Sequence, residues 1–232
     1  SCDGKYDFIF STWAKDVEYL STVIRELNNK FGSFIYDRQT STILRGQYFS
    51  REYLIGGKRN HSSRSTSFGA VPRGIDVKYS DWKILLCLGE NARMSAIDIA
   101  ARAGISADAV SDRIRKLEKQ GILQRFMFIP NESMYPYLHY KLLISLKNNS
   151  ESVERALSSY CASHPSIVYV VKALGLWDFE IDLEVESTEE FRSVMMEFKN
   201  CFQNDIKDYS SLQIYQVHKY NFCPSIPLLH KY

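Results

Sequence analysis

The chain has few cysteines, and they form no recognisable site. Its five cysteines are scattered along the sequence: Cys2, Cys87, Cys161, Cys201 and Cys223. None belongs to a Cys-x-x-Cys pair, and no histidine follows at the spacing of a zinc ligand. The sequence therefore predicts neither a disulfide framework nor a metal site. We expect reduced, partly buried thiols in a cytoplasmic protein that carries no metal or cofactor.

Long apolar runs and enzyme motifs are also missing. No apolar stretch is long enough to span a bilayer, and no signal peptide is visible. The sequence contains no Walker loop, no Gly-x-Ser-x-Gly elbow and no His-Glu-x-x-His helix. These absences predict a protein without a membrane partner and argue against an enzyme acting on phosphates, acyl groups or a bound metal.

The chain has little net charge, so a surface for nucleic acid has to be local. Formal net charge is +2 over 232 residues, a length that allows about two domains. The stretch 55–74 is rich in Gly, Ser, Arg and Lys, and its residues from Gly56 to Gly74 include no acid. It is predicted to be a flexible linker. Two interpretations of its charge stay open: it follows a phosphate backbone, or it is incidental.

An internal repeat is the first positive signal. The segment from Gly4 to Phe10 matches the segment from Gly175 to Ile181, and the match continues without a gap. The further identities pair Glu18, Val23, Glu26, Asn29, Phe31, Ile35, Asp37 and Ile43 with Glu189, Val194, Glu197, Asn200, Phe202, Ile206, Asp208 and Ile214. Each copy is predicted to form a half-buried strand, an amphipathic helix and a second strand, the last near 41–48 and 211–220.

The second copy is preceded by a further strand, helix and strand. Segments 140–146, 152–163 and 166–171 have these patterns, which gives the order β-α-β-β-α-β of a ferredoxin-like domain. The first copy has only the last β-α-β of that unit. We expect its missing half to lie upstream of Ser1, or another chain to cover its open sheet edge.

Residues 75–131 have the pattern of a winged helix-turn-helix. Asp81 is the expected N-cap of a first helix, and Ser95 with Asp98 resembles a capping pair for a second. Its inner face is predicted to carry Ile97, Ile99, Ala100 and Ala103. Gly104 ends that helix, because glycine adopts a positive φ without steric cost. Ser106 then caps a third helix, and residues 122–129 are predicted to form the wing hairpin.

The third helix has one edge that has to be buried. Val110, Ile114 and Leu117 recur at helical spacing, so the opposite side faces outward, toward the major groove if DNA is present. The predicted DNA-binding residues are Ser106, Ala107, Asp108, Ser111, Asp112, Arg115 and, in the wing, Arg125. Since two of them are acidic, a single unit is expected to bind weakly, and a dimer or higher oligomer is expected to supply useful affinity.

These motifs resemble the Lrp/AsnC family of transcription regulators, in which a helix-turn-helix precedes a ferredoxin-like domain called RAM. The resemblance rests on the stretch from Val110 to Glu118 with the Gly-Ile-Leu after it, and on the loop from Leu174 to Asp178. It implies an α+β fold with a partial RAM-like unit at 1–54, the linker at 55–74, the winged helix-turn-helix at 75–131, a RAM domain at 132–225 and a tail at 226–232. It also implies a tandem parent protein, of which this chain begins within the first RAM domain.

The resemblance further implies double-stranded DNA, a second copy of the chain and a small effector, such as an amino acid, as partners. RAM sheets of the family form the dimer, and the effector lies at their interface. The residues that match the family's effector loop are Gly175, Leu176, Trp177 and Asp178 in one copy and Gly4, Tyr6 and Asp7 in the other. Trp177 and Tyr6 are equally well explained as core aromatics.

Two alternatives to a ligand-responsive regulator stay open at this stage. Sirohaem decarboxylases are enzymes that resemble the same family, and they would need basic and histidine residues around a tetrapyrrole. His139, His164, His218 and His230 are spread out and form no recognisable catalytic cluster. The second alternative is a RAM partner that binds no DNA and modulates other family members, which the partial first copy favours.

Overall fold

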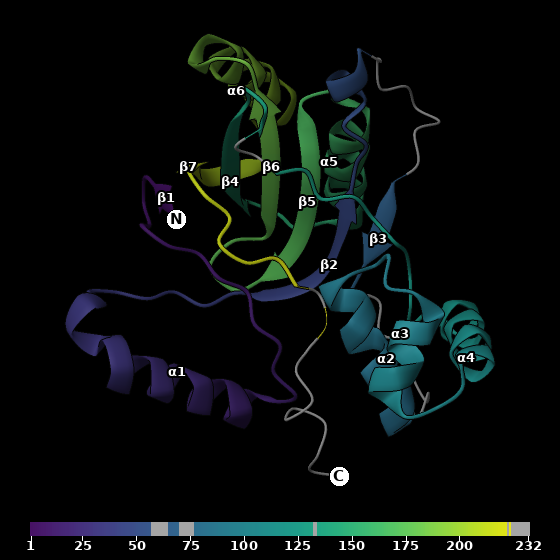
Figure 1. Cartoon of the computed structure of the whole chain (residues 1–232). Coiled ribbons are helices and arrows are strands. Elements are labelled where there is room, and N and C mark those ends of the chain that lie inside the picture. The colour runs from purple at the N-terminus through teal and green to yellow at the C-terminus, as the bar shows by residue number, and fades with distance from the viewer. Residues whose placement is uncertain (57–64, 70–76, 132–133, 222, 224–232) are drawn as a thin grey trace. The chain divides into compact units, whose positions relative to one another are not determined.

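The computed structural model describes residues 1–56, 65–69, 77–131, 134–221 and 223 (Figure 1). The predicted tail at 226–232 and much of the predicted linker lie outside this described part. The chain divides into two compact units. One unit comprises the described residues of Ser1–Ile9, Gln39–Ala70 and Ile129–His218, and the other those of Phe10–Arg38, Val71–Phe128 and Lys219–Tyr232.

The α-helices of the described chain are α1 (Val17–Phe31), α2 (Tyr79–Glu90), α3 (Ala96–Ala103), α4 (Ala107–Lys119), α5 (Glu151–Ser163) and α6 (Thr188–Phe202). Two short 3-10 turns lie at Gly32–Phe34 and Glu52–Ile55. The strands are β1 (Cys2–Asp3), β2 (Thr42–Tyr48), β3 (Thr66–Phe68), β4 (Leu138–Leu146), β5 (Ile167–Leu174), β6 (Phe179–Val185) and β7 (Ile206–Ile214). These elements confirm an α+β fold.

The first unit is built on one seven-stranded sheet in the order β1-β7-β4-β6-β5-β2-β3 (Figure 1). Its four central strands and two helices follow one another as β4-α5-β5-β6-α6-β7, and all of the pairings between these strands are antiparallel. This is the predicted β-α-β-β-α-β arrangement of a ferredoxin-like domain. β7 begins at Ile206 and ends at Ile214, earlier than the predicted strand near 211–220.

Both helices of the ferredoxin-like domain pack on the same face of the sheet. The core joins Leu142, Ile144, Ile181 and Leu183 of the strands to Leu157 and Cys161 of α5 and to Val194, Met195, Phe198 and Phe202 of α6. Removal of this apolar surface from water is the main stabilising contribution to the domain. The amphipathic helix predicted for the second repeat copy is confirmed as α6, and the helix predicted at 152–163 is confirmed as α5.

The prediction that the strand at 177–185 has one buried face is wrong. Residues of both faces of β6 are buried, including Asp182 and Glu184, which are 5% and 2% exposed. The reason is tertiary: Arg51 and Tyr53, which follow β2, contact Glu184 on the face away from the helices. A periodicity-2 pattern reports alternation along one strand and carries no signal for chain segments that cover its polar face later.

The first repeat copy is only partly the predicted β-α-β unit. The helix forms as α1 and the last strand as β2, but residues 6–10 are not a strand. β2 pairs instead with β5 of the ferredoxin-like domain, and short β1 pairs with β7. Within the predicted linker, β3 is ordered and pairs with β2, so this part of 55–74 is not a flexible tether.

Among the described residues, no helix combines the length and the apolar character needed to cross a membrane.

Candidate functional site

The recognition helix of the predicted helix-turn-helix is α4, and local sequence explains where it starts. Gly104 has φ +74°, the left-handed conformation that ends α3. Ser106 is extended, and its hydroxyl oxygen accepts the Ala109 N–H at 3.2 Å. These residues confirm the predicted turn and N-cap. At the other end, Gly121 has φ +71° and follows the C-cap residue Gln120.

The inner edge of α4 is buried as predicted. Val110 is 0% exposed and joins a cluster with Ile84, Cys87, Leu88, Ile99 and Ala103, against which Ile114 packs. Leu117 is also buried. One inner-face prediction for α3 is wrong, because Ile97 is 74% exposed. Residues two apart on a helix point in nearly opposite directions, so Ile97 and Ile99 do not share a face.

The outer edge of α4 presents the predicted residues to solvent. Asp108, Asp112 and Arg115 are exposed, while Ala107 and Ser111 are partly buried. Arg115 Nη1 lies 3.1 Å from Asp112 Oδ1, with both side chains more than three-quarters exposed. The structure thus brings the six predicted α4 residues, the N-cap included, onto one surface, where the basic side chain is held by an acidic neighbour.

Asp81 was predicted to be the N-cap of α2, but it is the third residue of that helix. The helix begins at Tyr79 after the N-cap Lys78, whose N–H donates to Asp81 Oδ2 at 3.3 Å. Asp81 is buried, and its Oδ1 accepts from Arg113 Nη1 at 2.5 Å. This ion pair links α4 to α2, so it fixes the orientation of α4 within the unit. No pattern in the sequence indicated this role of Arg113.

The predicted wing hairpin is not formed by residues 122–129, which contain no strand. Its candidate DNA-binding residue Arg125 is exposed. Three apolar side chains near it are exposed as well: Phe126, Phe128 and Ile129. Alternation of apolar and polar residues favoured strands, but no neighbouring strand of the described chain pairs with this segment.

The two predicted effector loops lie together on the face of the sheet that α5 and α6 leave uncovered. Tyr6 and Trp177 are tilted rings with centroids 6.2 Å apart. Both pack against a small apolar cluster of Cys2, Leu143 and Leu212. The interpretation of these aromatics as core residues is therefore supported by their packing. Leu176 is exposed, 52% of its surface being accessible.

The carboxylate of Asp178 is engaged by the chain itself. Its Oδ2 accepts the Leu146 N–H at 2.8 Å, and its Oδ1 accepts from Asn149 Nδ2 at 3.1 Å. Its own N–H donates to the Ile144 carbonyl oxygen at 2.8 Å. Asp178 therefore anchors the loop to β4, a role that the sequence did not predict.

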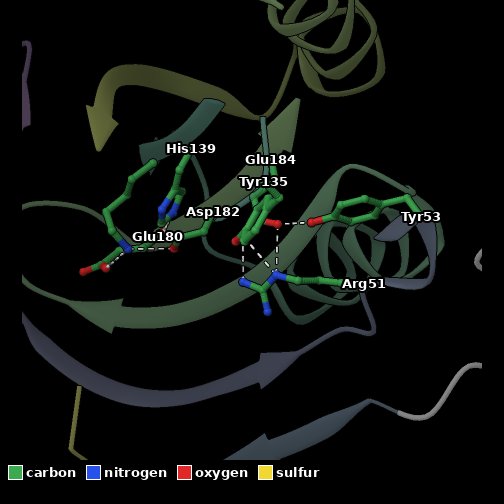
Figure 2. Close-up of polar contacts among 8 residues, drawn as sticks. Arg51, Tyr53, Tyr135, His139, Glu180, Asp182 and Glu184 are labelled. Carbon is green, nitrogen blue, oxygen red and sulfur yellow. Dashed lines mark hydrogen bonds and ion pairs between the residues drawn. The ribbon is translucent and has the colours of Figure 1, made fainter. Parts of the chain in front are cut away.

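A buried group of charged side chains lies on the same face and was missed by sequence analysis (Figure 2). Lys141 Nζ contacts Asp182 Oδ2 at 2.7 Å and Glu180 Oε2 at 3.1 Å. His139 Nε2 lies 2.8 Å from Asp182 Oδ1, and Trp177 Nε1 donates to Glu180 Oε1 at 3.0 Å. The only signal in the sequence was the charged alternation of β4 and β6.

Glu184 is the centre of a second group on that face. Arg51 donates to both of its carboxylate oxygens, with distances from 2.8 to 3.0 Å. Tyr53 and Tyr135 donate their hydroxyl hydrogens to the same carboxylate (Figure 2). Bidentate arginine contacts of this kind fix orientation as well as charge, so Glu184 ties the segment after β2 to β6.

Electrostatic coupling shifts the pKa values of the Lys141 group. Burial by itself would lower the pKa of Lys141, but Asp182 and Glu180 outweigh it and raise that pKa above its ordinary value. Burial by itself would raise the pKa of Asp182, but Lys141 and His139 outweigh it and hold that pKa low. Both groups are therefore charged at neutral pH, and the arrangement is a satisfied buried network.

The described histidines have separate surroundings. His139 belongs to the Lys141 group, and His164 Nδ1 accepts the Ser166 N–H at 3.2 Å at the end of α5. His218 lies against the ring of Phe8. His230 lies outside the described residues. No group of three or more metal-ligating side chains occurs in the part of the chain that the structure describes.

Comparisons with known proteins indicate a DNA-binding regulator, as the helix-turn-helix does. A family model described as "Winged helix-turn-helix DNA-binding" matches residues 78–124. The leucine-responsive regulatory protein of Rhizobium meliloti is 28% identical over 144 residues, which cover 62% of this chain and 92% of that protein. The HTH-type transcriptional regulator AldR of Mycolicibacterium smegmatis is 26% identical over 130 residues, covering 56% of this chain and 76% of that protein.

Solved structures share the fold. A transcriptional regulator of Neisseria meningitidis in complex with L-Met matches with a TM-score of 0.56 and 17% identity, over 65% of this chain and 97% of that one. An AsnC family transcriptional regulator of Agrobacterium tumefaciens matches with a TM-score of 0.55 and 20% identity, over 66% of this chain and 99% of that one. The helix-turn-helix match, the named relatives and the common fold together support a DNA-binding transcription regulator similar to those of the Lrp/AsnC family.

Proposed function

We propose that α4 is the DNA-recognition helix of this regulator and that its outer edge enters the major groove. The observation that carries the proposal is the two-sided character of α4: Val110 and Leu117 are buried, and Asp112 and Arg115 are exposed. The proposed contact residues are Ser106, Ala107, Asp108, Ser111, Asp112 and Arg115, with Arg125 from the segment that follows.

The charge of this edge favours binding by an assembly. Asp108 and Asp112 repel phosphates, and Arg115 has to leave Asp112 to contact a base or a phosphate. The exposed Arg115–Asp112 pair contributes little stability, so exchanging it costs little. We propose that two or more recognition helices bind neighbouring half-sites together, which raises affinity without a new contact in any one unit.

Arg115→Ala is expected to weaken DNA binding by about 1–3 kcal/mol, roughly 5- to 150-fold, if Arg115 reads a base. The DNA is a site recovered by genome-wide capture of bound fragments, and the measurement is a mobility-shift titration at several salt concentrations. The matched control is Arg155→Ala. Arg155 is an exposed helical arginine that is also paired with an acid one turn away, but it lies on α5. Equal affinities of the Arg115 variant and the unchanged protein at every recovered site would contradict the assigned role.

We further propose that a small amino acid is the effector and that it binds at the paired loops. The Neisseria meningitidis regulator is in complex with L-Met, which supports this ligand class. The proposed contact residues are Gly4, Tyr6, Asp7, Gly175, Leu176, Trp177 and Asp178. The backbone N–H groups of the two loops, other than that of Asp178, suit a carboxylate, and the Tyr6 and Trp177 rings suit an apolar side chain. Binding would act by population shift, changing the spacing of the recognition helices.

An amino acid that binds the folded protein is expected to raise its melting temperature in proportion to the logarithm of its concentration above Kd. The measurement is thermal unfolding against a panel of amino acids that includes L-methionine. Trp177→Ala is expected to remove the shift, whereas Met196→Ala, an exposed change on α6, is expected to keep it. If no amino acid stabilises the unchanged protein, this effector class is wrong, although DNA binding through α4 is unaffected.

A further inference from the structure

The two copies of the sequence repeat each contain a helix at the same position of the repeat. α1 and α6 occupy corresponding residues from end to end, Val17–Phe31 and Thr188–Phe202. Each is preceded by an extended N-cap, Asp16 in one and Ser187 in the other, whose side-chain oxygen accepts the N–H three residues later. The repeat is therefore structural as well as sequential.

The loops that precede these helices also match in conformation. The Cys2 N–H donates to the Asp7 carbonyl oxygen at 2.9 Å, and the corresponding Ala173 N–H donates to the Asp178 carbonyl oxygen at 2.8 Å. The same hydrogen bond closes both loops, although one belongs to a complete ferredoxin-like domain and the other to a partial copy.

Each copy pairs with the other through corresponding residues. At one edge of the four-stranded domain, β1 pairs with β7, and at the other edge β2 pairs with β5. The pairs are Asp3 with Gln213 and Cys2 with Ile214 at the first edge, and Leu174 with Thr42 and Ala173 with Ile43 at the second. When each residue is replaced by its counterpart in the repeat, the pairs of the first edge become the pairs of the second edge. Each copy then takes the place of the other. Reciprocal pairing of this kind defines an isologous, two-fold contact.

The irregularities of the two edges correspond as well. The N–H groups of Tyr215 and of the residue after it both donate to the Ser1 carbonyl oxygen, at 3.0 and 3.4 Å, so Tyr215 is the extra residue of a β-bulge. At the other edge, the register shifts between Ile43 and Arg45, which leaves Leu44 as the extra residue. Leu44 and Tyr215 are counterparts in the repeat, so the same bulge occurs at both edges.

Close approaches between the copies follow the same rule. A Cβ atom built on Gly4 would lie 2.7 Å from the Ser211 carbonyl oxygen, and one built on Gly175 would lie 3.1 Å from the Thr40 carbonyl oxygen. Ser211 and Thr40 are counterparts, as are the two glycines, whose φ values are +127° and +147°. Each glycine therefore permits its loop to approach the backbone of the other copy.

The local two-fold axis passes near Tyr6 and Trp177. These residues are counterparts in the repeat, and their ring centroids lie 6.2 Å apart. In a two-fold arrangement, a residue that contacts its own counterpart lies at the axis. The arrangement has two chemically different halves there, since a tyrosine faces a tryptophan.

We propose that residues 1–9 and 39–56 and the RAM domain form, within one chain, the two-fold strand pairing that an isologous dimer builds from two chains. The partner of the β5 and β7 edges is the first repeat copy of the same chain. A second chain cannot pair with these edges while they are filled, so the assembly proposed for DNA binding uses other surfaces. This inference does not depend on DNA or effector binding.

Cysteine cross-linking tests the proposal at both edges. In a background with Cys201→Ser and Cys223→Ser, one variant carries Asp3→Cys and Gln213→Cys, and another carries Thr42→Cys and Leu174→Cys. Opposite residues of paired strands have Cβ atoms about 4.5–5.5 Å apart, within reach of dibromobimane. Most of these positions are exposed, so the substitutions are expected to be tolerated. Two variants are controls. One carries the mismatched pair Thr42→Cys and Gln213→Cys. The other carries Gln213→Cys alone and controls for linkage to the native Cys2.

Both matched variants are expected to cross-link within single chains of 26.9 kDa, and the controls are not. The readout is electrophoresis under denaturing conditions, with the linked peptides identified by mass spectrometry and folding checked by circular dichroism. Linkage between two chains at either edge would overturn the proposal in favour of pairing in trans. Absence of linkage at one or both matched edges in the folded variants would overturn the local symmetry itself.

Discussion

Lys141→Met is expected to lower the free energy of unfolding of the RAM domain by about 3–5 kcal/mol, because it leaves buried carboxylates without their cation. Lys141 and Asp182 have side chains that are 12% and 7% exposed, and Glu180 shares the same ammonium group. The measurement is urea unfolding followed by circular dichroism. Lys147→Met is the matched control, because Lys147 is an exposed lysine just after the same strand.

The cause can be separated from lost packing by a second variant and by pH. The triple variant Lys141→Met, Glu180→Gln, Asp182→Asn removes the charges together and is expected to recover much of the lost stability. If the triple variant is as unstable as Lys141→Met, the unpaired charge is not the cause and the prediction fails.

The pH dependence has a definite sign. The pKa of Asp182 is held low in the folded protein, so its contribution is present above its unfolded value of about 3.9 and is lost as pH falls through the folded value. The pKa of Lys141 is raised, so its contribution is present below about 10.4 and is lost as pH rises through the folded value. Lys141→Met removes the largest charge that lowers the pKa of Asp182 and leaves His139, so the variant has less stability to lose than the unchanged protein as pH falls below about 5. The difference from the unchanged protein is therefore expected to narrow over that range.

Ile99→Ala is expected to unfold the helix-turn-helix while the sheet remains folded. Ile99 is fully buried in the cluster that joins α2, α3 and α4, and truncating such a residue costs about 2–5 kcal/mol. For a unit with so small a core, this loss is comparable to its whole stability. We expect DNA binding to be lost and the α2–α4 amides to exchange fast, while the amides of β4–β7 stay protected.

The control for this variant lies two residues away. Ile97→Ala removes the same atoms from the same helix, but Ile97 is 74% exposed, so stability and fold are expected to change little. Equal loss of protection in the sheet and in the helices of the Ile99 variant would show that the two units unfold together. Equal effects of the two variants would show that burial of Ile99 is not what supports the helix-turn-helix.

Features that are local in sequence were predictable. Ser95, Ser106 and Gly104 set the ends of α3 and α4, because capping and positive φ depend on a few neighbouring residues. The apolar periodicity of α4 and α6 gave their buried faces for the same reason. The ungapped repeat likewise predicted α1, whose bounds match those of α6.

The wrong predictions concern features that depend on contacts with segments distant in sequence. Asp81 is a plausible cap in sequence, but Arg113 draws it into an ion pair between helices. Residues 6–10 alternate like a strand, yet they have no strand beside them to complete a ladder. Glu184 and Asp182 are charged residues on the side of β6 that alternation assigns to solvent. Their burial is tolerated because Arg51, Lys141 and neighbouring side chains pair with their carboxylates.

The sequence by itself determined the helix-turn-helix, the order of the ferredoxin-like strands and helices, and the existence of two related copies. Each of these depends on periodicity, caps and glycines that act over a few residues. Only the tertiary structure decided that β2 joins the edge of β5, that β1 joins β7, and that Tyr6 meets Trp177. These contacts join residues more than a hundred positions apart, and their free energy depends on which surfaces meet, which no local pattern specifies.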